Sequence, residues 1–260
     1  MKSILTYYGG KQKLVSAVLP LFPDHKLYCE PFAGGAAIFF AKQPSEIEVL
    51  NDTNGQLMNF YKVVRNDFIS LQKKIDISLH SRKQYDDASV IYNHPHLFND
   101  LEKAWAVWIL ANESYASIID GSWGYDKTKN ILGKKIVNKK KNFTEEYAIR
   151  LQTVQLECAD ALYIIKSRDH AKAFHYCDPP YFNSDCGHYG GYSGQDFEAL
   201  LQTLAEVKGK FLLSSYWSDL LANYVKKYGW YQKQVVQQVS VNKGAGKLKT
   251  ECMTANYFIE

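Results

Sequence analysis

The chain has 260 residues, of which 46% are hydrophobic and 14% aromatic. This is enough apolar material for the core of a large folded domain, and it excludes a disordered chain. The five cysteines are odd in number and include no Cys-x-x-Cys pair, which argues against a disulfide framework or a zinc site. No apolar run approaches the roughly 20 residues that span a bilayer, and no secretory signal is recognisable, so we expect a cytoplasmic protein with no membrane partner.

The net charge of +4 conceals an uneven distribution. Residues 127–142 contain seven lysines and no acidic residue, so this segment carries +7 and the rest of the chain −3. A basic segment on a mildly acidic body is typical of a protein that binds a polyanion such as nucleic acid. A solvated lysine loop is the alternative interpretation.

The first motif in chain order is Tyr7-Tyr8-Gly9-Gly10-Lys11. We expect a short helix over residues 12–19 to follow it and to end at Pro20. Two glycines before a lysine at a helix start allow backbone and ammonium groups to approach an anion. A simple Gly-Gly turn would give the same pattern.

A strand, a glycine-containing loop and a helix are expected next, over residues 27–29, 30–35 and 36–41. This order allows the backbone to approach a nucleoside closely, although the loop lacks the phosphate-binding G-x-G-x-x-G pattern. The acid that precedes the loop, Glu30, suits a cationic ligand that bears an amino acid better than it suits a pyrophosphate.

A second strand over residues 46–50 ends at Asn51-Asp52. An acid about 20 residues beyond the glycine loop is placed to bind ribose hydroxyls. The alternative is that Asp52 or Thr53 caps a helix over residues 56–68.

Residues 56–150 lack the pattern of a sheet. Residues 101–110 predict a buried helix, and the aromatic residues Tyr115, Trp123 and Tyr125 precede the lysine segment. Aromatic side chains beside lysines can stack on bases and contact phosphates.

The motif Asp178-Pro179-Pro180-Tyr181 follows an apolar run that predicts a short buried strand. The prolines have nearly fixed φ and hold the neighbouring carbonyls rigidly. In open α/β sheets ligands bind at the carboxyl ends of strands. A planar base with an exocyclic amino group fits this cluster, because Asp178 and the Pro179 carbonyl accept its two protons and Tyr181 stacks on its ring. A strand that simply ends in a proline turn is the alternative.

The remaining segment predicts the second half of a sheet. Residues 182–192 are rich in glycine and polar residues and predict a loop that closes over a substrate, with His188 exposed in it. A helix over residues 195–207, a strand over 210–214, another helix and a final strand pairing over 251–259 complete the expected elements.

The ordered motifs Tyr-x-Gly-Gly-Lys, Glu-Pro-Phe-Ala-Gly-Gly, Asn-Asp and Asp-Pro-Pro-Tyr resemble the Dam family of DNA adenine-N6 methyltransferases, its phage-type members included. The resemblance runs from Tyr7 to about Tyr257. Many members have Phe-x-Gly-x-Gly, whereas this chain has Ala36 in place of the last glycine. The resemblance implies a doubly wound, Rossmann-like α/β fold of S-adenosylmethionine-dependent methyltransferases. The catalytic domain would comprise residues 1–55 and 151–260, with an inserted, mostly helical target-recognition subdomain at 56–150.

The resemblance also implies the reaction and its residues. The donor would be S-adenosylmethionine and the acceptor adenine N6 at a specific site in double-stranded DNA, with the base flipped out of the duplex. No metal would be needed. Residues implied for the donor are Tyr7, Gly9, Lys11, Glu30, Phe32, Gly34 and Asp52, together with Asp160 for the donor's adenine, where a helix cap is the alternative. Residues implied for catalysis are Asp178, Pro179, Pro180 and Tyr181.

Two other functions remain open at this stage. The same catalytic cluster suits any planar amine or amide, so cytosine N4, RNA adenine or a protein glutamine are alternative acceptors. A DNA-binding relative that has lost catalysis is the other possibility. The motifs leave open the recognition sequence, a restriction partner and the oligomeric state.

Overall fold

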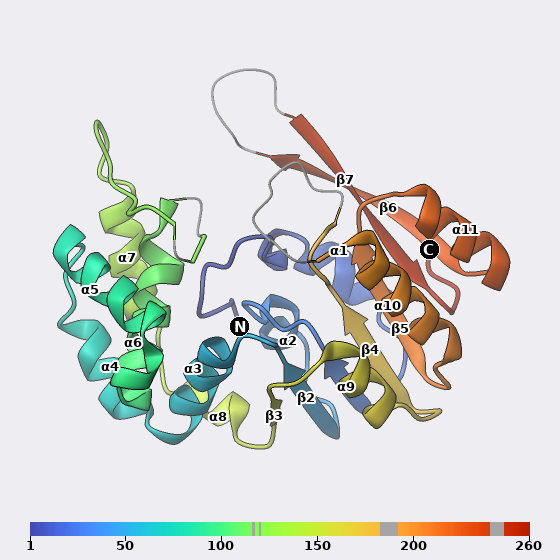
Figure 1. Cartoon of the computed structure of the whole chain (residues 1–260), viewed down its shortest axis with the longest axis horizontal. Helices are drawn as coiled ribbons and strands as arrows, with labels where there is room; N and C mark the ends of the chain where they lie inside the picture. The colour runs from blue at the N-terminus through green and yellow to red at the C-terminus, as the bar shows by residue number, and fades with distance from the viewer. Residues whose placement is uncertain (116–117, 120, 183–191, 240–246) are drawn as a thin grey trace. The chain divides into compact units, whose positions relative to one another are not determined.

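The computed structural model describes residues 1–115, 118–119, 121–182, 192–239 and 247–260 (Figure 1). Its seven strands form one sheet in the order β3-β2-β1-β4-β5-β7-β6. The strands are β1 (Leu27–Glu30), β2 (Ile47–Asn51), β3 (Gln155–Glu157), β4 (Ala173–Cys177), β5 (Lys210–Ser215), β6 (Tyr231–Val239) and β7 (Lys247–Ala255).

The sheet is parallel at its centre and antiparallel at one edge. Strand β1 pairs in parallel with β2 and β4, and β4 pairs in parallel with β5, whereas β7 is antiparallel to both β5 and β6. The strand order reverses between β1 and β4, as in a doubly wound sheet. The predicted α/β, Rossmann-like fold is therefore confirmed.

The chain divides into two compact units. Unit 1 comprises Met1–Val15, Gly34–Gln43 and Asp52–Cys158, and unit 2 comprises Ser16–Ala33, Pro44–Asn51 and Ala159–Glu260. Unit 1 is largely helical, with α2 (Ala37–Ala41), α3 (Gly55–Asn66), α4 (Phe68–Asp76), α5 (Arg82–Asn93), α6 (Asp100–Glu113), α7 (Leu132–Lys141) and α8 (Glu146–Leu151). Its single-turn 3-10 helices are η1 (Lys11–Lys13) and η3 (Pro95–Leu97).

Unit 2 contains six of the seven strands and packs helices against them. All residues of β1 and of β4 are buried, as expected for parallel strands that are covered on both faces. The core beside β4 and β5 contains Cys177 and Phe211 from these strands. It also contains Leu200 and Leu221, each from a helix of unit 2. The helices of unit 2 are α9 (Ala161–Arg168), α10 (Gly194–Glu206) and α11 (Asp219–Tyr228).

One expected helix was wrong, and another begins at a different cap residue. In place of one helix over residues 12–19 the chain forms η1, a four-residue α1 (Val15–Val18) and a 3-10 turn, η2 (Leu19–Leu21), which has Pro20 in its first turn. Proline is accepted there because the first N–H groups of a helix have no partner within the helix. The expected helix over 56–68 is α3, which ends before Phe68 opens α4, and its cap is Asn54, whose Oδ1 accepts hydrogen bonds from Gln56 N and Leu57 N.

The lysine segment is also more ordered than a loop. Ten of its residues form α7, and Ile136 is the buried residue of that helix within unit 1. Residues 183–191 of the predicted closing loop, His188 among them, lie outside the described residues. Among the described helices, none combines the length and the apolar character needed to cross a lipid bilayer.

Candidate active site

Four parallel strands of unit 2 end at the same edge of the sheet. These strands are β2, β1, β4 and β5, and their last residues are Asn51, Glu30, Cys177 and Ser215. The carboxyl ends of parallel strands at the point of order reversal form the usual ligand-binding crevice of such sheets. The motif that begins at Asp178 follows β4 directly, at the centre of this edge.

The structure brings the two ends of this motif together. The Tyr181 hydroxyl donates a hydrogen bond to Asp178 Oδ1 at 3.1 Å. Between them, Pro179 is buried and Pro180 is partly buried. The carboxylate and the aromatic ring therefore form one local cluster, as the sequence predicted.

The Tyr181 hydroxyl has two further neighbours that sequence reasoning missed. Ser214 Oγ lies 2.9 Å away and Glu251 Oε2 lies 3.2 Å away. Ser214 Oγ in turn donates to Glu251 Oε2 at 2.9 Å. Burial, followed by the charges of Asp178 and Glu251, raises the pKa of Tyr181 well above its ordinary value, so the hydroxyl remains a donor at neutral pH.

The ring of Tyr181 is itself held in place. Its centroid lies 4.4 Å from that of Tyr216, in an edge-on arrangement with an interplanar angle of 65°. Edge-to-face pairs of this kind are favourable and restrict the ring plane. No pattern in the sequence identified Tyr216 as a partner, because the contact depends on how β4 and β5 pair.

The acid before the glycine loop is fixed by its own strand. Glu30 is 3% exposed, and the Tyr28 hydroxyl donates to its Oε2 at 2.7 Å. Burial and the charge of Glu30 raise the pKa of Tyr28 well above its ordinary value. Two residues further along, Phe32 packs against the core beside β4. Glu30 thus places a fixed carboxyl group at the end of β1.

Asn51 joins two loops of unit 2 and was not assigned a role from the sequence. Its Nδ2 donates to the carbonyls of Pro31 at 2.9 Å and Ala159 at 3.0 Å, and its Oδ1 accepts from Ala159 N at 2.9 Å. Asn51 is fully buried. It therefore holds the segment after β1 beside the residue that precedes the predicted adenine-binding acid.

Within unit 1, the glycine loop lies against the first motif and the acid after β2. Gly34 has φ of +47°, and a Cβ on it would come within 3.3 Å of the Tyr7 ring. Asp52 Oδ2 accepts a hydrogen bond from Gly34 N at 2.9 Å, and Asp52 Oδ1 accepts one from Asn54 N at 2.9 Å. Burial raises the pKa of Asp52, and these two hydrogen bonds oppose that rise. The fold thus brings Tyr7, Gly34 and Asp52 together.

Ala36 stands where many relatives of the predicted family have the last glycine of the loop. It is the only non-glycine residue of the described chain with a positive φ, at 49°, and it caps α2. Two residues before Ala36, the Gly34 carbonyl accepts a hydrogen bond from the Tyr61 hydroxyl at 2.6 Å, which fixes the loop at that point. The loop therefore keeps a left-handed turn without glycine at that position.

Lys11 and Gly9 form a local pair. The Lys11 ammonium donates to the Gly9 carbonyl at 3.1 Å, and Lys11 is only 5% exposed. Gly9 has a φ of +71°, which glycine adopts without strain. The fold thus places the buried amino group of Lys11 beside the first glycine turn of unit 1.

Asp160 has the cap role that was left open for it. Its Oδ1 accepts a hydrogen bond from Tyr163 N at 2.9 Å at the start of α9, and the residue is exposed. A role at the donor's adenine stays a prediction. The described ranges contain no group of three or more His, Cys, Asp or Glu side chains placed to hold a metal ion.

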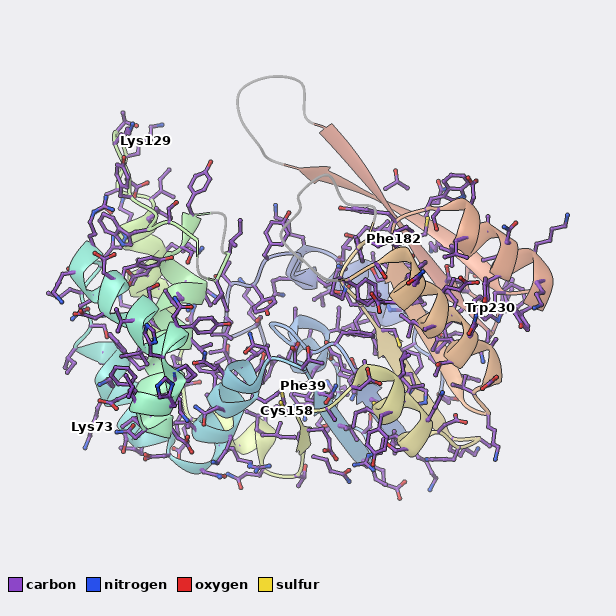
Figure 2. The ribbon with its side chains drawn as sticks, in the orientation of Figure 1. Phe39, Lys73, Lys129, Cys158, Phe182 and Trp230 are labelled. Atoms are coloured by element: carbon purple, nitrogen blue, oxygen red, sulfur yellow. The ribbon has the colours of Figure 1, made fainter. Side chains whose placement is uncertain are left out.

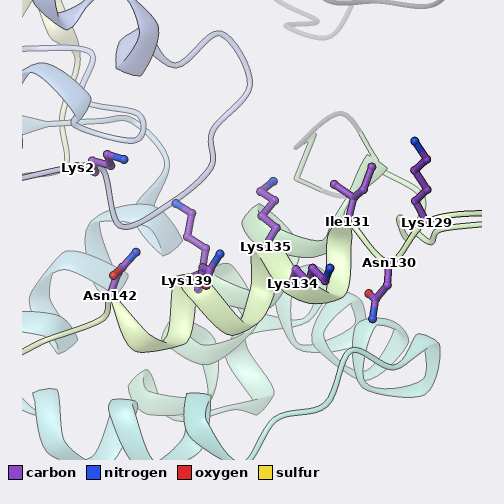
Figure 3. A pocket seen from close by; sticks show the side chains of 9 residues that line it. Lys2, Lys129, Asn130, Ile131, Lys134, Lys135, Lys139 and Asn142 are labelled. Atoms are coloured by element: carbon purple, nitrogen blue, oxygen red, sulfur yellow. The ribbon is translucent and has the colours of Figure 1, made fainter.

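The lysine segment lines an open pocket of about 760 Å³ in unit 1 (Figure 3). Lys135 and Lys139 point to one side of α7, toward Lys2, because residues four apart share a helix face. Burial, followed by the nearby charges of Lys135 and Lys2, lowers the pKa of Lys139 to about 8. The other lining residues are Lys129, Asn130, Ile131, Lys134, Asn138 and Asn142. Such a pocket favours an anion.

Two of the lysines also hold the fold together. Lys139 Nζ donates to the carbonyls of Ser3 and Ile4 at 3.2 Å each, and Lys140 Nζ donates to those of Asp76 and Ser78. Replacing either lysine therefore alters packing as well as charge. Lys129, Lys134 and Lys135 are better probes of anion binding.

Aromatic residues gather beside this basic segment. Trp123 and Tyr125 are stacked with centroids 5.7 Å apart, and the Arg82 guanidinium lies 4.8 Å from the Trp123 ring. Trp123 Nε1 also donates to Glu113 Oε2 at 3.4 Å, and burial raises the pKa of Glu113 to about 7. The two rings thus form a fixed platform in unit 1.

Comparison with known proteins identifies a family and several relatives. Residues 7–239 match the family described as D12 class N6 adenine-specific DNA methyltransferase. A DNA N-6-adenine-methyltransferase of Escherichia phage P1 is 25% identical over 76% of this chain, which corresponds to only 26% of that longer protein. A type II methyltransferase of Lactococcus lactis subsp. cremoris is 22% identical over 99% of this chain and 96% of its own length. The retron Ec67 DNA adenine methylase of Escherichia coli is 23% identical over 98% of this chain and 92% of its own length.

Proposed function

The chain belongs to the D12 class of N6 adenine-specific DNA methyltransferases, which confirms the family that its motifs predicted, and we propose that it methylates adenine N6 in double-stranded DNA with S-adenosylmethionine as donor. The observation that carries this proposal is the cluster after β4, where the Tyr181 hydroxyl lies 3.1 Å from Asp178 Oδ1. An acceptor carboxylate and an aromatic face at the carboxyl end of a central strand suit a planar amino-bearing base.

The residues of unit 1 fit the proposed donor. Each oxygen of Asp52 accepts one backbone N–H, and a carboxylate has about four acceptor positions, so ribose hydroxyls can still bind it. Gly34 lacks the side chain that would press on Tyr7. Near the methionine end, Gly9 and Lys11 would bind the carboxylate. When bound, S-adenosylmethionine supplies a methyl group activated by its sulfonium.

The predicted residues of unit 2 have proposed roles of their own toward the donor and the base. Glu30 would offer a buried carboxyl group to a cationic group, Phe32 would line the loop, and Asp160 would accept from the adenine amino group of the donor. Asp178 and the Pro179 carbonyl would accept the two protons of the target amino group and so direct its lone pair. Tyr181 would stack on the flipped base. Positioning is the main catalytic effect, with stabilisation of developing positive charge second.

Nucleoside analysis tests the proposed reaction. Purified protein, duplex DNA and donor with a labelled methyl group are incubated, and the DNA is digested to nucleosides. We expect the label in N6-methyldeoxyadenosine. Label in N4-methyldeoxycytidine would replace the proposed acceptor, as would label that appears only when RNA or protein is supplied in place of the duplex. DNA binding without any labelled product would indicate a catalytically silent relative.

We also propose that residues 56–150 form the target-recognition subdomain, inserted into a catalytic domain of residues 1–55 and 151–260. The helices α3 to α8 fall within or at the edges of this range. The basic pocket beside α7 and the stacked Trp123 and Tyr125 supply two of the usual means of contacting nucleic acid, namely cations for phosphates and flat rings for bases.

Asp52→Ala should weaken binding of the donor by about 1.5–3 kcal/mol, the usual cost of losing hydrogen bonds to a charged group. DNA affinity should change little. Isothermal calorimetry with S-adenosylmethionine measures the first quantity, and fluorescence anisotropy with duplex DNA the second. Asp86→Ala, on the exposed face of α5, is the matched control. Unchanged donor affinity in folded Asp52→Ala protein would remove Asp52 from the site.

Replacing Lys129, Lys134 and Lys135 with glutamine should weaken DNA binding and its dependence on salt. Each lysine that contacts a phosphate contributes about 0.9 to the slope of log K against log salt on duplex DNA. Binding titrations at several salt concentrations measure this slope. Lys73→Gln is the control, because Figure 2 places Lys73 at the other end of the helical part of unit 1 from Lys129. If the triple variant keeps both affinity and slope, the pocket does not contact DNA.

A further inference from the structure

Asn51 is the last residue of β2, and its side chain connects two loops of unit 2. In the sheet order β2 lies between β1 and β3, so a residue at its carboxyl end is beside the loops that follow both neighbours. Asn51 Nδ2 donates to the Pro31 carbonyl at 2.9 Å, in the loop after β1. The same amide contacts Ala159, two residues after β3: Nδ2 donates to its carbonyl at 3.0 Å, and Oδ1 accepts from its N–H at 2.9 Å.

These contacts use the whole amide group of Asn51. An asparagine amide offers two N–H donors and one carbonyl acceptor, and here both kinds of group are bound to main-chain atoms. The main chain of Asn51 adds a further contact, because its carbonyl accepts from Ala33 N at 2.8 Å. The loop after β1 is therefore fixed to Asn51 at both Pro31 and Ala33.

The place of Asn51 in the strand makes an amide unexpected. Asn51 is fully buried, as are the apolar residues Val49 and Leu50 that precede it. Burying an amide is costly unless its polar atoms are hydrogen-bonded. Aspartate lacks the N–H donors and serine has a single O–H group, so neither could make the same set of contacts. The position therefore requires an amide of this length that bridges two loops.

Each of the two loops carries a residue that is proposed above for the donor. Glu30 directly precedes the loop after β1 and is proposed for the cationic amino-acid end. Asp160 lies in the loop after β3 and is proposed for the adenine. Asp160 Oδ1 accepts from Tyr163 N, and a carboxylate has about four acceptor positions, so it can still accept from a ligand. The two loops that Asn51 joins would thus bind opposite ends of one ligand.

We propose that Asn51 is a positioning residue for the methyl donor: its amide sets the spacing between the loop that binds the amino-acid end and the loop that binds the adenine. Asn51 does not itself touch the donor. A ligand with two ends gains affinity over its separate parts only where both sites are held at a matching distance. Holding the loops in advance also avoids the cost of ordering them on binding. This inference rests on the proposed function, because it takes S-adenosylmethionine as the donor.

The consequence is an effect that depends on the connection between the two ends of the ligand. In Asn51→Asp the side chain keeps its size, loses both N–H donors and places a carboxylate against two carbonyl oxygens. Each loop keeps its own binding residue, so the separate ends, adenosine and methionine, should bind as in wild type. S-adenosylhomocysteine, which joins these ends, should bind about tenfold to a hundredfold more weakly.

Binding measurements with the three ligands test this arrangement. Calorimetry measures the affinity of S-adenosylhomocysteine, and ligand-observed NMR titrations measure the weaker affinities of adenosine and methionine. The deciding quantity is the affinity of the joined ligand divided by the product of the two fragment affinities. This ratio should fall about tenfold or more in Asn51→Asp. Local damage to one loop would weaken its fragment and the joined ligand alike, and would leave the ratio unchanged.

Asn256 provides a matched control in the same unit. Its Oδ1 accepts from Phe211 N at 3.0 Å and its Nδ2 donates to the Gly209 carbonyl at 2.9 Å, so it also joins main-chain atoms through an amide. These contacts lie at the amino end of β5, the opposite end from the edge where the ligand is expected. Asn256→Asp should lower the thermal unfolding midpoint and leave the ratio near wild type.

A second variant covers a failure of Asn51→Asp to fold. Asn51→Ser introduces no charge, and its hydroxyl is too short to reach both loops, so the same fall in the ratio is expected.

The outcomes separate this inference from the proposed function. Wild-type protein that binds no S-adenosylhomocysteine and forms no N6-methyladenine overturns both. Active wild-type protein overturns only the role of Asn51 if the ratio is unchanged in folded Asn51→Asp or Asn51→Ser, or if it falls equally in Asn256→Asp.

Discussion

Asp178→Ala should lower the rate of methyl transfer on the order of a thousandfold, while binding of donor and DNA largely survives. The alanine removes the carboxylate that we propose as acceptor of an amino proton, to which the Tyr181 hydroxyl also donates at 3.1 Å. Without that acceptor the lone pair of the target nitrogen is no longer directed, and the positive charge that develops there loses its nearest compensation. Single-turnover kinetics with saturating donor and DNA measure the loss.

Asp178→Asn is the informative companion to this substitution. Asparagine keeps the size and one acceptor oxygen but lacks the charge, so its rate should fall between those of Asp178→Ala and wild type. Calorimetry with the donor and anisotropy with DNA should show near wild-type affinities for both variants. An Asp178→Ala protein that is folded, binds both ligands and still methylates at more than a tenth of the wild-type rate would exclude the carboxylate from the reaction.

The free energy of unfolding should fall as the pH is lowered from about 6.5 to about 4, because of one buried histidine in β4. His175 is fully buried, and its Nε2 lies 3.7 Å from Asp169 Oδ1, beyond hydrogen-bonding distance. Burial lowers the pKa of His175 from 6.5 to about 4, and the charge of Asp169 only partly opposes this. Between pH 6.5 and about 4, His175 binds a proton in the unfolded chain but not in the folded chain. The free energy of unfolding therefore decreases as the pH falls through this range. Two and a half pH units correspond to about 3 kcal/mol.

Denaturant unfolding at a series of pH values measures this effect in wild type and in His175→Leu. The leucine variant should lose most of the decline between pH 6.5 and 4, whatever its stability at neutral pH. His96→Leu, at an exposed position in η3, is the control and should follow the wild-type curve. Parallel curves for wild type and His175→Leu would show that His175 is not the group that titrates.

The central sheet was predictable because its strands carry their own signal. Strands β1 and β4 are buried along their whole length, so they read as short apolar runs, and each is followed by a motif that ends the strand. Asp178 and Tyr181 were expected to lie together because only two residues separate them. These local arrangements are determined by residues that are close together in the sequence. They can therefore be recognised from the sequence alone.

Contacts that depend on strand pairing were not predictable. Ser214 lies 33 residues from Tyr181 and Glu251 lies 70 residues from it, and both positions appeared only as members of ordinary strands. Their meeting requires β7 to insert beside β5 in a particular register. Asn51 is a similar case, since its amide reaches Ala159, 108 residues further along the chain.

Helix boundaries failed for a different reason. Asp52, Thr53 and Asn54 are all residues that can cap a helix, and the choice of Asn54 depends on Asp52 being used by Gly34 N. The lysine segment showed too little apolar periodicity to predict α7, because Ile136 is the only buried residue of that helix. In both places small differences in tertiary contact decided the local structure.

The left-handed turn at Ala36 bears on how such proteins are found in genomes. An alanine in that region of backbone space costs roughly 1–2 kcal/mol relative to its preferred conformations, and the surrounding loop must supply that energy through contacts such as the one from the Tyr61 hydroxyl to the Gly34 carbonyl. A signature that demands glycine at this position would reject the chain, although its φ of 49° is one that glycine favours. A signature written on backbone conformation instead of residue type would retain it, along with other chains in which a small side chain has replaced the glycine.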